Sequence, residues 1–258
     1  MDAIVTAGGI PQPGEPLYEY TQGKSKALLD VAGKPMIQWV LDALDQAATV
    51  ERVIIMGLPE NGGVTGSKIV CYLPNFEDMV ENIKEGVKEV MRINPDARHV
   101  LIVSSDIPGI TGEIIDWVVN AAMETDDDAY YNVITKEVME KRYPTSKRSY
   151  IHLKGMEICG GDTNVVATRL VTQENDIWKK LVDSRKNALK QAALLGFDTL
   201  FLLLFRLVDL DDGIKKVSKR LHIKGRAVVC PYAEVGMDID KPHQLEIMRA
   251  DLAKSEQA

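Results

Sequence analysis

The chain has 258 residues, of which 45% are hydrophobic and 27% are charged, and its formal net charge is -7. This length suffices for one large core with a modest elaboration. An acidic chain lacks the basic stripe with which proteins bind nucleic acid through its phosphates, so we exclude a nucleic acid partner. It can still bind one nucleotide, for which a few lysines, backbone amides and a metal ion suffice.

The spacing of the cysteines and the N-terminal residues indicate a cellular compartment for the protein. The three cysteines are far apart, include no CxxC pair and lie at Cys71, Cys159 and Cys230. This spacing predicts neither a disulfide framework nor a zinc site, and it fits a reducing cytosol. The first residues, MDAIVTAGG, enter a short apolar strand without a basic segment before it. We therefore expect a cytoplasmic protein without a signal peptide.

Short apolar runs and amphipathic segments alternate in the first half of the chain. They predict strands at 2–6, 52–56, 99–103 and 129–134, a loop at 10–25, and helices at 35–48, 76–93 and 111–123. Thr111 is placed to cap the last of these helices. The strand runs are apolar throughout, as in strands buried on both faces. The pattern predicts an α/β fold: a mainly parallel open sheet with helices on both faces.

The second half of the chain is less regular. Residues 137–168 predict a β insertion that could form a lid, residues 175–221 are expected to be mostly helical, a strand is predicted at 226–230, and a last helix begins near Pro242. The apolar run at 192–208 is short for a membrane span and contains Asp198 and Arg206. We interpret it as a buried helix. A homo-oligomer or partner surface and contact with a membrane surface are the alternatives.

A glycine pair, Gly8-Gly9, follows the first predicted strand. Ligands of open α/β sheets bind outside the carboxyl ends of the strands. Glycines at that place let backbone N–H groups approach a phosphate without a Cβ atom in the way. The segment is neither a P-loop nor a GxGxxG dinucleotide motif, because no GK[ST] closes it and the spacing differs. Taken alone, the pair is equally compatible with an ordinary turn.

Two further motifs follow the glycines: Lys26-Ala27-Leu28-Leu29, and then Gly33-Lys34-Pro35-Met36-Ile37. With these parts in this order, the chain resembles the sugar-phosphate and molybdenum-cofactor (MobA-like) nucleotidyltransferases of the GT-A-like fold. The resemblance implies that Lys26 is catalytic, because a cation there offsets the charge that builds up as the α-phosphate is attacked. The nucleotide-binding residues that it implies are Ala7, Gly8, Gly9, Lys24, Lys26, Asn82 and Asp106.

The chain departs from the resembled pattern in the loop after the glycines. The family has an arginine a few residues after them, whereas residues 10–23 contain neither arginine nor lysine, and the loop is longer. We expect Lys24 to supply the missing charge.

Two aspartates are candidate ligands of Mg²⁺, which takes oxygen ligands and shares them with phosphates. Asp106 follows the predicted strand 99–103, at its carboxyl end. The segment Asp238-Ile239-Asp240-Lys241-Pro242 resembles the D-[IV]-D-x-P segment near the C-terminus of the same enzymes. This implies Asp240 as the second ligand, with Asp238 as the alternative. A turn or cap role for Asp106 and an N-cap role for Asp240 stay open.

The resemblance places acceptor-binding residues in the segment GGDTN, at Gly161, Asp162 and Asn164, where a plain glycine turn is the alternative. It places Asn82, on the predicted helix 76–93, opposite the base and ribose. The four histidines form no close pair, so we expect neither a zinc site nor a Ser–His–Asp triad.

The resemblance thus implies an EC 2.7.7-type enzyme with one domain over residues 1–258, divided into a nucleotide-binding half (1–135) and an acceptor-binding half (136–258). It would transfer a nucleoside monophosphate group from an NTP to a sugar phosphate or molybdopterin-like acceptor, with Mg²⁺ as cofactor and pyrophosphate as product. A GT-A glycosyltransferase would need a D-x-D where this chain has Ser104-Ser105-Asp106. A non-catalytic nucleotide-binding sensor or scaffold is the alternative from another class, and the missing loop arginine favours it.

Overall fold

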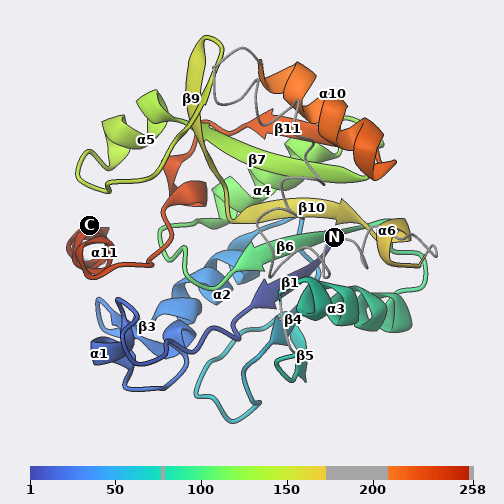
Figure 1. The fold of residues 1–258 in the computed structure, drawn as a ribbon. Helices are drawn as coiled ribbons and strands as arrows, with labels where there is room; N and C mark the ends of the chain where they lie inside the picture. The colour runs from blue at the N-terminus through green and yellow to red at the C-terminus, as the bar shows by residue number, and fades with distance from the viewer. Residues whose placement is uncertain (77–78, 173–208, 256–258) are drawn as a thin grey trace.

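The computed structural model describes residues 1–76, 79–172 and 209–255 (Figure 1). Nine strands form one sheet: β1 (Asp2–Thr6), β4 (Arg52–Met56), β5 (Ile69–Leu73), β6 (His99–Ser104), β7 (Ala129–Thr135), β8 (Ile151–Leu153), β9 (Met156–Gly160), β10 (Thr163–Ala167) and β11 (Gly225–Val229). A separate two-stranded ribbon pairs β2 (Asp30–Val31) with β3 (Lys34–Pro35). The helices are α1 (Tyr18–Thr21), α2 (Met36–Gln46), α3 (Met79–Ile93), α4 (Gly112–Ala122), α5 (Lys136–Arg142), α6 (Arg169–Thr172), α10 (Leu210–Leu221) and α11 (Pro242–Ser255), with short 3₁₀ turns η1 (Lys26–Leu28) and η2 (Ala233–Gly236).

The strand order of the large sheet is β5-β4-β1-β6-β10-β7-β9-β8, and β11 pairs with β7. Strands β5, β4, β1 and β6 run parallel to one another. Strand β10 runs antiparallel between β6 and β7, so its first residues lie beside the last residues of β6. In the register of the parallel strands, Thr6 is opposite Met56 on one side and Ser104 on the other. The carboxyl ends of β1, β4 and β6 therefore lie level with one another.

Helices cover both faces of the sheet, and alternate residues of β1 show how (Figure 1). Ala3 and Val5 belong to the large core that also contains buried residues of α2 and α4. Ile4 points the other way, into a second core with Val87 and Val90 of α3. The prediction of a mainly parallel open sheet with helices on both faces is confirmed. Because β1 is buried on both sides, the loop that leaves it at Ala7 starts from a rigid support.

One prediction about local structure needs correction, and one strand was not predicted. The region 137–168 does contain the hairpin β8–β9, but it begins with helix α5, and its last strand, β10, lies inside the main sheet. The side chain of Thr135 accepts a hydrogen bond from the N–H of Val138 and so caps α5. Strand β5 was not predicted, because its residues follow a glycine-rich stretch and form only a partly covered strand at the sheet edge.

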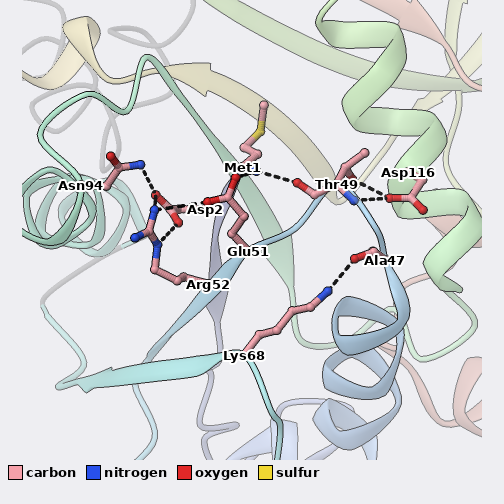
Figure 2. A network of polar contacts seen from close by, with 9 residues as sticks. All are labelled: Met1, Asp2, Ala47, Thr49, Glu51, Arg52, Lys68, Asn94 and Asp116. Carbon is pink, nitrogen blue, oxygen red and sulfur yellow. Dashed lines mark hydrogen bonds and ion pairs between the residues drawn. The ribbon is translucent and has the colours of Figure 1, made fainter.

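A polar network fixes the opposite end of the sheet, where β1 and β4 begin (Figure 2). Asp2 is 4% exposed, and its carboxylate accepts hydrogen bonds from Arg52 Nε at 2.6 Å and Asn94 Nδ2 at 3.0 Å. Asp116 accepts from the backbone N–H and hydroxyl of Thr49 at 2.8 and 2.6 Å. The buried charge of Asp2 is thus paired with hydrogen-bond donors and joins β1 to β4, while the contacts of Asp116 join α4 to the segment before β4.

The apolar run at 192–208, with its predicted helix, lies outside the described residues. Among the helices that the structure describes, none is both long enough and apolar enough to cross a lipid bilayer.

Candidate active site

The candidate site lies at the carboxyl ends of β1 and β6, where the antiparallel strand β10 begins. The N–H of Ser105 donates to the carbonyl oxygen of Thr6 at 3.1 Å, which continues the pairing of β1 and β6 by one residue. The N–H of Ser104 donates to the carbonyl oxygen of Asp162 at 2.9 Å. Sheet hydrogen bonds thus bring Asp106 and Asp162 to the same edge, although they come from different halves of the chain.

Lys26 stands at the centre of the site between two carboxylates. Its Nζ atom donates to Asp106 Oδ2 and to Asp240 Oδ1, each at 2.6 Å. The lysine side chain is 14% exposed, the Asp106 side chain 17% and the Asp240 side chain 57%. Ser104 Oγ donates to the second oxygen of Asp106 at 2.5 Å, which holds that carboxylate in place. The three residues predicted as catalytic or metal-binding therefore meet at one point.

The charges of this cluster shift two pKa values. Burial opposes the charged form of Lys26, but the carboxylates of Asp106 and Asp240 outweigh it and raise the lysine pKa above its ordinary value. Burial raises the pKa of Asp162 to about 7, and the negative charge of Asp106 acts in the same direction. Because the charge of Asp106 acts on the pKa of Asp162, Asp162 is electrostatically part of the same cluster. Arg148 opposes this rise in the pKa of Asp162.

Asp240 is brought to the site by the turn before α11. The N–H of Ile239 donates to the carbonyl oxygen of Asp106 at 2.9 Å. Gln244 Oε1 accepts from the N–H groups of Asp240 and Lys241 at 2.9 and 2.8 Å. The glutamine thus reaches back over the start of the helix, as in a capping box. Because α11 begins at Pro242, the residue before it is Lys241. The alternative role of Asp240 as the N-cap is therefore wrong.

Asp238, the alternative metal ligand, is held elsewhere by Arg148. The two side chains form an ion pair and are 12% and 15% exposed. Arg148 follows α5 in the chain, so this pair joins the segment before β8 to the segment before α11. Arg148 could not be identified from the sequence, because nothing in a basic and polar stretch marks one residue as the partner of an aspartate far along the chain. The pair positions the segment that carries Asp240.

A pocket of about 320 Å³ opens beside Lys26 and Asp106; its other lining residues are Thr6, Gly8, Gly9, Ala27, Asn75, Phe76, Met79, Asn82, Ser104 and Ser105. Within the part of the chain that the structure describes, no acceptor meets the N–H groups of Gly8 and Gly9. Free backbone N–H groups at a strand end can bind an anion. Asn75 closes over the glycines, since its Nδ2 donates to the carbonyl oxygen of Gly8 at 3.1 Å.

Asn82 lines this pocket, but its amide binds protein atoms. Its Oδ1 accepts from the N–H of Phe76 at 2.8 Å, and its Nδ2 donates to Asn75 Oδ1 at 2.9 Å. Asn82 as a whole residue is 7% exposed. Asn82 therefore holds Asn75, which lines the same pocket and which the sequence analysis missed.

The structure places the remaining predicted residues as follows. Lys24 is exposed and does not line the pocket beside Lys26 and Asp106. The carbonyl oxygen of Ala7 accepts from Ser25 Oγ at 3.2 Å, and the alanine is buried beside the pocket rather than lining it. Asn164 Oδ1 accepts from the N–H of Asn132 at 2.8 Å, and its Nδ2 donates to the carbonyl oxygen of Gly161 at 2.9 Å. Of the three predicted acceptor residues, Asp162 is the one that the structure brings to Asp106.

The carboxylates fit a divalent cation. Asp106 and Asp240 direct oxygen atoms at one positive charge, and oxygen donors of this kind are those that Mg²⁺ takes. Within the described residues, no three histidine, cysteine, aspartate or glutamate side chains form a complete metal cluster. Water and substrate phosphates would have to supply the other ligands, which is the usual arrangement for Mg²⁺ at phosphate sites.

Comparison with known proteins gives one family match and partial matches to characterised proteins. The profile of the MobA-like NTP transferase domain matches residues 4–201. A 3-deoxy-manno-octulosonate cytidylyltransferase of Vibrio vulnificus is 34% identical over 102 residues, which are 38% of this chain and 39% of that protein. A probable molybdenum cofactor guanylyltransferase of Pyrococcus horikoshii is 26% identical over 97 residues, which are 38% of this chain and 47% of that protein. The chain thus spans less than half the length of these curated relatives.

Solved structures share the fold over almost the whole chain. A hypothetical transferase from Thermus thermophilus is 31% identical with a TM-score of 0.82, covering 95% of this chain and 98% of that one. A 2-C-methyl-D-erythritol 4-phosphate cytidylyltransferase from Thermus thermophilus, at 15% identity and a TM-score of 0.57, covers 98% of each chain. At that identity the second likeness concerns the fold alone.

Proposed function

Because this chain belongs to the MobA-like NTP transferase family, we propose that it transfers a nucleoside monophosphate group from an NTP to a phosphorylated acceptor and releases pyrophosphate. The convergence of Lys26, Asp106 and Asp240 beside the pocket of Gly8 and Gly9 carries this proposal. This arrangement offers fixed positive charge, oxygen ligands and free N–H groups in one place, which are the groups that phosphoryl chemistry needs.

Each of these groups has a role in the proposed reaction. The N–H groups of Gly8 and Gly9 would hold phosphate oxygens of the NTP, and Lys26 would offset the charge that develops on the α-phosphate. Asp106 and Asp240 would hold Mg²⁺, which when bound neutralises phosphate charge and orients the triphosphate. The attacking acceptor phosphate is already an anion, so the protein supplies position and charge rather than a strong base.

We assign the acceptor to the half of the chain that contains Asp162. A molybdopterin-like acceptor agrees with the name of one curated relative, a probable molybdenum cofactor guanylyltransferase, whereas the other, a 3-deoxy-manno-octulosonate cytidylyltransferase, is named for a sugar acid. Those names also make CTP and GTP the first nucleotides to test. A cytoplasmic location is part of the proposal, and the free cysteines Cys71, Cys159 and Cys230 support a reducing compartment.

The test is pyrophosphate release from each of the four NTPs, with Mg²⁺ and a panel of sugar phosphates and molybdopterin-like acceptors. We expect release with one NTP, dependent on one acceptor class and on Mg²⁺. The variant Asp106→Asn, which keeps the shape of the side chain, should lose this release. Release that is independent of Mg²⁺ and unchanged in Asp106→Asn would contradict the assignment of the site.

A non-catalytic nucleotide sensor is the second candidate, and one observation favours it. Residues 10–23, the loop next to the proposed triphosphate site, contain neither arginine nor lysine. A sensor would bind NTP and be stabilised against heat by it, yet release no pyrophosphate with any acceptor. Pyrophosphate release, measured together with thermal stabilisation by NTP, therefore distinguishes the sensor from the enzyme.

A further inference from the structure

A second cavity adjoins the pocket beside Lys26 and Asp106. It measures about 480 Å³ and is lined by Gly9, Lys26, Asp240 and Lys241 together with loop residues from Ile10 to Leu17. Gly9 and Lys26 line both cavities, so the two meet at the proposed phosphate site. A chain of phosphates held by the glycine loop has room to extend into this second cavity.

The charges already present at the site would oppose such a ligand. Lys26 is shared between Asp106 and Asp240, so these three side chains together carry a net charge of -1 at neutral pH. A nucleoside triphosphate brings several more negative charges, and buried charges need partners of opposite sign. Even with one Mg²⁺ bound, a further cation is needed next to the phosphates.

The described residues offer few candidates for that cation. The loop at residues 10–23 contains neither lysine nor arginine, and the exposed Lys24 lines neither cavity. Arg148 forms its ion pair with Asp238. Lys241 lines the second cavity, and in the part of the chain described by the structure its ammonium group has no ion pair or hydrogen bond.

The backbone of Lys241 is fixed, while its side chain is exposed and free to reach a ligand. Its N–H donates to Gln244 Oε1 at 2.8 Å, at the start of α11. Besides Asp240, the acidic residue Glu15 lines the cavity, and its carboxylate accepts from the N–H of Gln12 at 2.7 Å. That contact occupies one oxygen of Glu15 with a loop donor, and Lys241 is the lysine of this cavity that is not paired with Asp106 and Asp240.

We propose that Lys241 binds the β- and γ-phosphates of the NTP, the part that leaves as pyrophosphate. The inference rests on the proposed function, since it assumes that the site accepts an NTP. It also explains how the site could bind the triphosphate with no cation in the loop at 10–23, because the positive charge would come from Lys241, one residue after Asp240.

The test compares the binding of NTP and NMP by titration calorimetry, at low salt with Mg²⁺, for the wild type and the variants Lys241→Gln and Lys241→Arg. Lys254, exposed near the end of α11, provides the matched control Lys254→Gln. We expect Lys241→Gln to weaken NTP binding about tenfold, the effect of one charged hydrogen bond, while NMP binding changes less than about twofold. Lys241→Arg should keep most of the affinity, and Lys254→Gln should bind as the wild type does.

Two results would overturn the proposal. If Lys241→Gln binds NTP as tightly as the wild type, Lys241 does not contact the phosphates, and the proposed function stands unaffected. Equal weakening of NTP and NMP would also contradict a contact with the β- and γ-phosphates, and Lys241→Arg would then show whether charge matters at all. A wild-type protein that binds none of the four NTPs would instead remove the proposed function, and this inference with it.

Discussion

A Cβ atom on Gly57 would lie 2.4 Å from the Cα atom of Gly8. Gly57 directly follows β4 and has a φ of +94°, and Gly8 lies in the loop that leaves the neighbouring strand β1. The loop proposed to bind phosphate therefore rests directly on the backbone of a second glycine. Both the positive φ and the close approach demand glycine at position 57.

We predict that Gly57→Ala destabilises the protein and displaces the loop of Gly8. Gly63 provides the control, since it too has a positive φ, of +76°, but an added Cβ would meet nothing within 4 Å. Urea unfolding should show a loss of about 1 kcal/mol for Gly63→Ala, the cost of backbone strain alone, and at least about 3 kcal/mol for Gly57→Ala. NTP binding should weaken only in Gly57→Ala. Equal losses of stability in the two variants would contradict the close packing of Gly8 on Gly57.

Replacing Lys26 tests the charge at the centre of the site. Lys26→Ala should lower kcat/KM for pyrophosphate release by about 10²–10³, the usual cost of removing one group that stabilises transition-state charge. Lys88→Ala, an exposed lysine on α3, should stay within about twofold of the wild type. An activity of Lys26→Ala within about threefold of the wild type would mean that the lysine serves only to pair Asp106 and Asp240.

The variant Asn82→Ala should act through Asn75. It removes a hydrogen bond to Asn75 and leaves the N–H of Phe76 without its partner, so we expect a loss of about 1–3 kcal/mol in urea unfolding. KM for the NTP should rise, with little change in kcat, because Asn75 would no longer be held against the glycine loop. The exposed residue Asn120 on α4 supplies the control, since Asn120→Ala should change stability by less than about 0.5 kcal/mol. An effect on kcat alone would indicate a direct catalytic role for Asn82 instead.

Asp162 should make the stability of the protein depend on pH. Its pKa is about 7 in the folded protein against 3.8 as the ordinary value, so the folded state binds more protons between these values. Stability should therefore fall as pH rises from about 4 to 7 and then level off. Asp162→Asn removes this loss and should be more stable than the wild type by about 2–4 kcal/mol at pH 8, with no gain near pH 4.

The measurement is urea unfolding across this pH range with a chelator present, so that no metal ion screens the carboxylate. Asp96→Asn, at an exposed position, serves as the control and should follow the wild-type curve. If the free energies of unfolding of the wild type and Asp162→Asn depend on pH in the same way, ionisation of Asp162 does not destabilise the folded protein, which would contradict the prediction.

Much of the fold could be predicted from periodicity, because the central elements are buried on definite faces. Strands β1, β4, β6 and β7 and helices α2 and α4 all lie where apolar spacing predicts them. The predicted cap is also present, as the Thr111 hydroxyl accepts from the N–H of Ile114 at 3.3 Å. Strand β5 and helix α5 escaped prediction because edge and surface elements bury few residues, so their sequences carry little periodicity.

The part of the candidate site that lies in local sequence motifs could also be predicted. Lys26, Asp106 and Asp240 each belong to a local motif, and the sheet topology then brings the three motifs together. No such motif marks the ion pair of Arg148 with Asp238. None marks the hydrogen bond by which Asn82 holds Asn75 either. They are contacts between side chains from separate segments, and only the folded chain shows which donor meets which acceptor.

The hydrogen bond from the N–H of Ile239 to the carbonyl oxygen of Asp106 joins positions more than half the chain apart. During synthesis the strands of the first half emerge long before residue 240, and domains generally begin to fold as they emerge. A nascent chain that has reached only residue 200 holds Lys26 and Asp106 but not the turn that supplies Asp240. Lys26, Asp106 and Asp240 can therefore meet only after the ribosome has passed residue 240, whereas the sheet that supports Asp106 can begin to form earlier.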